Sequence, residues 1–202
     1  EREIKRNTEE KPMYLYETRV VDHETAARNG EPFAALIKAR RYAPNPVARF
    51  CTQDLKIKAI GQYLREERGF PNPYVCLIGI RGDEQRRAAK MHGTVVTKMQ
   101  SKNDDPKNKD AWRSIAPMAT AGHTVDDVMN FWNQQEFDLQ LRPHEGNCDL
   151  CFLKGLGKKL SIIEARPDLA DWWSEQEQTL SKAVGKGASF RSDQPTYADM
   201  KV

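Results

Sequence analysis

The first third of the chain changes from an alternating to a helical pattern of apolar positions. Residues 1–12 are polar and carry no core signal, so we expect a lead-in without a regular element. Residues 13–21 alternate and are rich in β-branched and aromatic side chains, which predicts a strand. Residues 23–30 predict a short helix ended by Gly30, and 31–41 predict a second, amphipathic helix.

The next segment predicts a rigid loop, a helix and a buried strand. The two prolines in 42–50 favour a loop that delivers Cys51. Thr52 suits the N-cap of a helix over 53–67, whose apolar residues recur at helical spacing. The continuous apolar run 74–80 is typical of a strand buried on both faces. A further helix is expected over 83–91.

The second half predicts more helix than strand. Residues 100–110 are polar and predict a mobile loop, and 112–118 predict a short strand. Thr124 is placed to cap a helix, with Asp126 and Asp127 favourable in its first turn. Helices are also expected over 156–165 and 167–180, before a polar and aromatic tail at 185–202. The whole pattern predicts an α/β, helix-rich fold in a single domain over 1–202.

Composition narrows the class of protein. Apolar residues make up 39% of the chain and charged residues 30%, and the net charge is only +3. No run approaches the ~20 apolar residues that span a membrane, and no signal-peptide pattern opens the chain. The 4 cysteines are too few for a disulfide scaffold in 202 residues. We therefore expect a cytoplasmic protein without membrane contact, whose thiols serve a metal.

Three cysteines carry the strongest chemical signal. Cys148 and Cys151 form a Cys-x-x-Cys pair, which can hold one metal within a single turn, and Cys51 can close the site from a remote element. A redox dithiol would sit between a strand and a helix start, whereas this pair follows a proline and a glycine in a loop. Spacing alone leaves zinc and an iron–sulfur cluster equally open.

The fourth ligand is not settled by the sequence. His144 stands four residues before Cys148 and is a candidate ligand or an outer donor. Cys76 is the remaining sulfur, but it lies inside the apolar run, where core packing is the simpler expectation.

Basic residues indicate an anionic ligand. Arg81 follows the strand 74–80 between two glycines, at the strand end where α/β sheets bind ligands. Arginine there suits bidentate contact with phosphate or sulfate, and a solvated basic helix is the alternative. The clusters Lys56 with Lys58 and Lys154 with Lys158 and Lys159 are each, taken alone, expected to be solvated helix faces, whereas several such clusters flanking the cysteines would suit an anionic substrate such as a nucleotide. The residues that we expect to face the nucleotide or cofactor are Lys56, Arg81, Glu84, Arg86 and Arg87.

Four segments together resemble the phosphoadenosine phosphosulfate (PAPS) reductase family of the PP-loop superfamily, many of whose members are phage proteins. They are RFCTQDLKIKAIGQYL, GIRGDEQRRAAKM, the FW and FDL pairs in 131–139, and GNCDLCFLKG, in a resemblance that covers Val20 to Tyr197. The resemblance implies the downstream part of a three-layer PP-loop (adenine nucleotide alpha hydrolase-like) fold. It also implies a [4Fe–4S] cluster on Cys51, Cys148 and Cys151, with Lys56 beside the cluster and Arg81 facing the nucleotide.

The chain departs from the family pattern at three places. Thr52 stands where a second tandem cysteine ligates the cluster in the family. The Ser-Gly-Gly-x-Asp-Ser loop that wraps pyrophosphate does not occur here, so it is expected upstream of Glu1 or on a partner chain. The tail also has no cysteine to serve as the nucleophile of PAPS reduction.

These features predict nucleotide-dependent sulfur or sulfonucleotide chemistry with a [4Fe–4S] cluster. Two versions stay open: sulfur transfer after adenylation of an acceptor by ATP, and reduction of PAPS or adenylyl sulfate with an external thiol reductant. Partners are then an adenine nucleotide or sulfonucleotide, a nucleic-acid acceptor, or a second copy of the chain. The alternative is a non-catalytic, zinc-stapled module that binds nucleic acid or protein.

Overall fold

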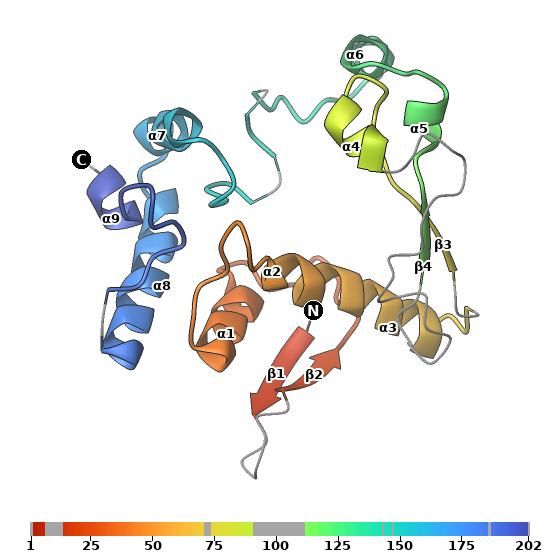
Figure 1. Ribbon diagram of the computed structural model, residues 1–202. Coiled ribbons are helices and arrows are strands. Elements are labelled where there is room, and N and C mark those ends of the chain that lie inside the picture. Colours follow the sequence, from red (N-terminus) through yellow and green to blue (C-terminus); the bar gives the residue numbers. More distant parts are fainter. Residues whose placement is uncertain are drawn as a thin grey trace. The chain divides into compact units, whose positions relative to one another are not determined.

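The computed structural model describes residues 2–6, 14–70, 74–90, 112–142, 144–146, 148–185 and 187–201. These residues are helix-rich with short strands, which confirms the mixed class predicted above (Figure 1). The chain divides into two compact units, unit 1 (Glu1–Ala59 with Leu141–Val202) and unit 2 (Ile60–Gln140). The single-domain expectation and the three-layer PP-loop fold stay predictions, and the expected mobile loop at 100–110 lies outside the described residues.

Unit 1 opens with an antiparallel strand pair, β1 (Arg2–Arg6) and β2 (Tyr14–Thr18), in which Arg2 lies opposite Thr18. The strand expected at 13–21 is therefore present but shorter. A strand also lies in the lead-in at 1–12, where no element was expected. Pairing with β2 supplies the backbone hydrogen bonds of β1, and the polar sequence of β1 does not indicate this pairing.

The prediction of a helix over 23–30 is wrong. Asp22 and Thr25 form a side-chain-closed turn instead, in which the Thr25 N–H donates to Asp22 Oδ1 at 2.9 Å. Such local hydrogen bonds compete with helix formation. Gly30 then adopts a left-handed conformation with φ 76° immediately before α1 (Glu31–Arg40), which confirms the second expected helix.

The core of unit 1 is formed by helices from both ends of the chain. Phe33 and Ile37 of α1 meet Trp173 and Leu180 of α8 (Leu169–Val184). Helix α7 (Leu156–Ala165) contributes the buried Ile162 and Ile163 and has its predicted bounds, whereas α8 begins two residues and ends four residues later than predicted. The tail adds α9 (Tyr197–Met200), which packs against α8.

Unit 2 contains a short parallel sheet of β3 (Tyr74–Leu77) and β4 (Trp112–Ile115). The expectation that β3 is buried on both faces is wrong, because Val75 is 55% and Leu77 68% exposed. A strand in a two-stranded sheet has one neighbour, so alternate side chains lack cover within the described residues. The strand expected at 112–118 is confirmed over its first four residues.

Helices complete unit 2. They are α4 (Gln85–Lys90), α5 (Pro117–Thr120) and α6 (Val125–Trp132), with α3 (Lys58–Glu66) crossing from unit 1 at its first residues. Thr124 caps α6 as predicted: its hydroxyl accepts the Asp127 N–H, and the Asp127 carboxylate accepts the Thr124 N–H in return. No described helix is long and apolar enough to cross a membrane.

Candidate metal centre

Cys51 lies in the first turn of a helix. The helix begins with α2 (Phe50–Thr52), continues through the π-helical segment η1 (Gln53–Ile57) and runs on into α3. Thr52 has helical angles, φ −65° and ψ −44°, so its predicted role as N-cap is wrong. The helix begins at Phe50, three residues earlier than the sequence indicates, and Cys51 is packed against the core of unit 1.

The π-helical segment shifts the side chains that follow Cys51. Its wider turn lets the Lys58 N–H donate to the Gln53 carbonyl, five residues back. Single π turns inside α-helices are frequent at functional sites. Here the π-helical segment begins two residues after Cys51 and carries Lys56, so the candidate basic residue lies on the irregular stretch and the candidate ligand lies just before it.

Asp54 anchors this helix, and the sequence reasoning missed it. Its carboxylate is fully buried, accepting hydrogen bonds from Arg40 Nη2 at 2.5 Å and from Lys58 Nζ at 2.8 Å. Burial alone raises the pKa of Asp54, but the two cationic donors outweigh it and hold the pKa below its usual value. The four-residue spacing of Asp54 and Lys58 is the sequence signal that could have predicted their ion pair.

The Cys-x-x-Cys pair forms a tight turn in unit 1. The Cys151 N–H donates to the Cys148 carbonyl at 3.2 Å, and the Lys154 N–H donates to the Cys151 carbonyl at 2.8 Å. Leu150 is 0% and Phe152 1% exposed, so both flanks of Cys151 are fixed in the core. The two cysteines are thereby left on the outer side of an anchored turn.

The three thiols lie within electrostatic range of one another. Burial raises the pKa of Cys51, and Cys151 and Cys148 raise it further. Burial also raises the pKa of Cys148, with Cys151 adding to the rise while Lys56 and Lys154 oppose it. Without a cation, the Cys51 and Cys148 thiols therefore keep their protons at neutral pH, and a bound metal would displace them.

The donor chemistry fits a thiophilic metal or an iron–sulfur cluster, since free thiols from two elements lie within electrostatic range of one another and of cationic side chains. Among the described residues, however, no three His, Cys, Asp or Glu side chains are close enough to hold a metal ion as they stand. A ligand would have to draw the three sulfurs together.

Lys154 links His144 to this turn by hydrogen bonds. The Lys154 ammonium donates to the carbonyls of His144 at 2.8 Å and Gly146 at 3.2 Å. The Nε2 atom of His144 is buried and has no hydrogen-bond partner within the described ranges. A buried polar atom without a partner is costly, so this nitrogen is the natural candidate for an additional ligand.

A cavity of about 460 Å³ borders the same turn. Asp149, which stands between the two cysteines, lines it together with Lys154 and Arg166. Arg142 and Glu145 form an ion pair of 2.8 Å in its wall. The cavity therefore offers charged groups of both signs at the turn that carries Cys148 and Cys151.

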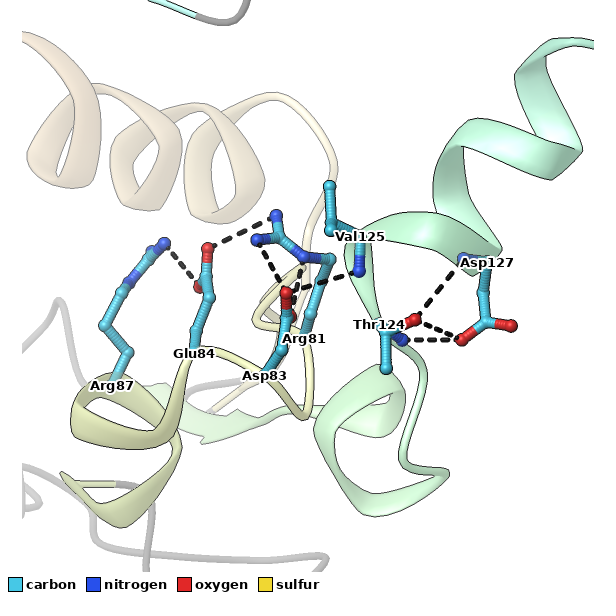
Figure 2. Close-up of polar contacts among 7 residues, drawn as sticks. All are labelled: Arg81, Asp83, Glu84, Arg87, Thr124, Val125 and Asp127. Carbon is cyan, nitrogen blue, oxygen red and sulfur yellow. Dashed lines mark hydrogen bonds and ion pairs between the residues drawn. The ribbon is translucent and has the colours of Figure 1, made fainter.

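The expected anion-binding segment lies in unit 2 and is internally paired (Figure 2). Arg81 Nε donates to Asp83 Oδ1 at 2.8 Å, and Arg81 Nη1 lies 3.4 Å from Glu84 Oε1. Arg87 Nη1 contacts the other oxygen of Glu84 at 2.7 Å. Asp83 also accepts the Val125 N–H at the start of α6, at 3.3 Å. A phosphate would have to compete with these carboxylates for Arg81.

The remaining predicted residues lie apart from the thiols along the chain. Arg86 is exposed on α4. Cys76 is half-buried on β3 in unit 2, where its register partner is Ser114. The turn that carries Arg81 is held by the Gly82 N–H, which donates to the His123 carbonyl at 2.8 Å. A side chain at Gly82 would come within 3.1 Å of the Gly122 backbone.

Comparison with known proteins gives one distant relative. The chain is 30% identical over 128 residues to a nin region protein of Escherichia phage lambda, ORF290, which is itself described as uncharacterised. The match covers 63% of this chain and 37% of that protein, so the chain spans little more than a third of its relative. No family model and no solved structure matches the chain. Similarity to a phage protein is in line with the expected phage relatives.

Proposed function

We propose that the chain holds a [4Fe–4S] cluster on Cys51, Cys148 and Cys151 and takes part in the nucleotide-dependent sulfur chemistry of the PAPS reductase-like family. The observation that carries the proposal is that these three thiols, from elements almost 100 residues apart, lie within electrostatic range of one another in unit 1. A structural role alone would bury such thiols separately, as small apolar side chains.

The residues around the thiols have defined tasks in this proposal. Lys56 and Lys154 place positive charge near Cys148 and so favour its thiolate. The Asp54 ion pairs fix the helix that presents Cys51. Cluster ligation by three thiolates would supply an iron with an open coordination position, because Thr52 stands beside Cys51.

Two separate features support the substrate side of the proposal, each taken by itself: the cavity beside the turn in unit 1, and Arg81 in unit 2. A sulfonucleotide or adenine nucleotide carries phosphate groups that suit arginine and lysine. In unit 2, Arg81 would need to exchange Asp83 and Glu84 for a phosphate, which makes nucleotide binding sensitive to salt and to the charge of these two residues.

Elemental analysis after anaerobic purification tests the cluster. We expect iron and acid-labile sulfide with the broad visible absorption of an iron–sulfur centre. Cys51→Ser, Cys148→Ser and Cys151→Ser should each lose most of the iron, whereas Cys76→Ser, the matched control in unit 2, should keep it. Full iron content in the Cys51→Ser/Cys148→Ser double variant would refute the ligand set.

Two assays separate the enzymatic versions. Reduction predicts sulfite release from PAPS or adenylyl sulfate in the presence of thioredoxin. Sulfur transfer predicts AMP formation from ATP together with labelled sulfur in an acceptor nucleic acid. Both assays use the longest natural form of the protein, because the chain spans only 37% of its phage relative.

A second candidate is a zinc-stapled binding module, which the buried, unpartnered Nε2 of His144 favours. Zinc would then use His144 with Cys51, Cys148 and Cys151. His144→Gln discriminates the two: it should abolish stoichiometric zinc in the module, and leave iron content unchanged in the three-thiolate cluster.

A further inference from the structure

The C-terminal segment reaches back to the Cys-x-x-Cys turn. Tyr197, the first residue of α9, is 2% exposed, and its hydroxyl donates to the Leu150 carbonyl at 2.5 Å. This carbonyl lies between Cys148 and Cys151. A Thr196–Asp199 capping box fixes the start of α9, so the tyrosine is held in place locally as well.

Two further contacts join the tail to the other flank of Cys151. Arg191 Nη1 donates to the Phe152 carbonyl at 3.4 Å. The ring of Phe190 stacks on that of Phe152, with centroids 6.0 Å apart and an angle of 15° between planes. The carbonyls immediately before and after Cys151 thus both receive donors from the tail, from residues 47 and 39 positions later.

Glu177 of α8 holds the tail itself. Its buried carboxylate accepts the Phe190 N–H at 3.1 Å and the Tyr197 N–H at 2.9 Å. Lys159 is fully buried, and its ammonium lies 4.9 Å from the centre of the Tyr197 ring. The sequence predicts Lys159 as part of a solvated cluster, and burial shows that this expectation is wrong for this residue. Burial and the nearby Arg191 lower the pKa of Lys159, while Glu177 and the face of the Tyr197 ring favour its charged form.

We propose that residues 190–197 act as a clamp that sets the position of the Cys148–Cys151 turn, with Tyr197 as its positioning residue. A turn of four residues has few hydrogen bonds of its own, and the sulfur separation follows its backbone. Donors from a fixed segment on both sides of Cys151 restrict that backbone before any metal binds. The clamp is proposed for the metal-free chain. Its effect on metal affinity rests on the proposed function.

Hydrogen exchange of the metal-free chain tests the clamp. Tyr197→Phe removes the hydroxyl alone and should speed amide exchange in the peptide 148–154 about fivefold, as expected for the loss of one hydrogen bond. Tyr42→Phe is the matched control, because the Tyr42 hydroxyl makes no hydrogen bond among the described residues and the side chain belongs to the same unit. It should leave this peptide unchanged.

Anaerobic titration with Co²⁺, followed by thiolate-to-cobalt absorption, measures the effect on the ligands. Outer contacts that orient metal ligands are worth about 10- to 100-fold in affinity, so Tyr197→Phe should bind Co²⁺ about tenfold more weakly than wild type and Tyr42→Phe equally well.

The outcomes separate the two proposals. Equal exchange at 148–154 in the two tyrosine variants overturns the clamp, as does a uniform rise in exchange across all peptides of unit 1, which would show general loss of packing. If the wild type binds no metal, the proposed function fails while the exchange data still decide the clamp. Faster exchange at 148–154 with unchanged Co²⁺ affinity supports the clamp and refutes its effect on the metal.

Discussion

Replacing Asp54 by asparagine tests how the helix that presents Cys51 is held. The aspartate is 0% exposed and accepts from both Arg40 and Lys58. Asparagine keeps the shape but loses the charge, and its amide group can turn an N–H toward a cation. The variant therefore strips two charged hydrogen bonds from a buried acceptor without opening a cavity.

The size of the effect follows from the contacts. Hydrogen bonds to charged groups contribute about 1.5–3 kcal/mol each, so the gross loss is about 3–6 kcal/mol. The Arg40 and Lys58 side chains are 24% and 32% exposed, however, so water recovers part of their solvation in the variant. We expect a net loss of about 2–3 kcal/mol in the free energy of unfolding, which lowers Tm by about 5–10 °C in a chain of this size.

Urea denaturation at neutral pH measures this loss. Glu175→Gln is the matched control, because Glu175 is exposed on α8 in the same unit and forms no ion pair within the described residues. It should change the free energy of unfolding by less than about 0.5 kcal/mol. A loss below that value for Asp54→Asn would refute the anchoring role.

The pH dependence of the same difference gives a second check. The pKa of Asp54 is lowered in the folded state, so its stabilisation is fully present above the ordinary value of 3.8 and is lost as the pH falls through the lower folded pKa. The gap between wild type and Asp54→Asn should stay constant from neutral pH to about pH 5 and shrink below pH 3.8. A gap that persists unchanged in strong acid would show that the loss is not electrostatic.

Two further changes test the packing of unit 1. Gly30→Ala should lower the free energy of unfolding by about 2–4 kcal/mol, because the residue has φ 76° and a Cβ would lie 2.7 Å from the Trp172 ring. The control is Gly69→Ala, because Gly69 has φ 62° and a Cβ there would have no atom within 4 Å. It should lower the free energy of unfolding by only about 1 kcal/mol in the same denaturation assay. Burial raises the pKa of Glu177 above 4.5 in the folded state, so its contribution to stability is lost as the pH rises from 4.5 through that folded pKa. Glu177→Gln should flatten this part of the stability–pH curve, and an unchanged slope would contradict the assignment.

Elements with local signals were predictable from the sequence. Thr124 and Asp127 form the capping box of α6 that their spacing indicates, and α7 begins and ends where its apolar pattern does. Caps and amphipathic spacing act within one or two turns of chain, so the information lies in neighbouring residues. The Thr52 cap failed because a helix can begin one turn earlier whenever the preceding loop allows it, and no local rule forbids that start.

Elements with distant partners were not predictable. The polar sequence of β1 does not predict a strand, because this strand is formed by its pairing with β2. The exposure of Val75 and Leu77 depends on how many strands and helices surround β3, which an apolar run does not report. Lys159 looks like its solvated neighbours in the sequence, yet Tyr197 and Glu177 make a buried site for it.

The candidate site likewise has features that the local sequence predicts and features that depend on distant contacts. The sequence by itself determined which side chains have the right chemistry: Cys51 and the Cys148–Cys151 pair are soft ligands at metal-binding spacing. Only the tertiary structure decided that these thiols lie within electrostatic range of one another in one unit, that Asp54 anchors the helix of Cys51, and that Tyr197 reaches the turn between the other two. Ligand type is a property of single residues, whereas proximity between residues 51, 151 and 197 depends on the packing of the whole core.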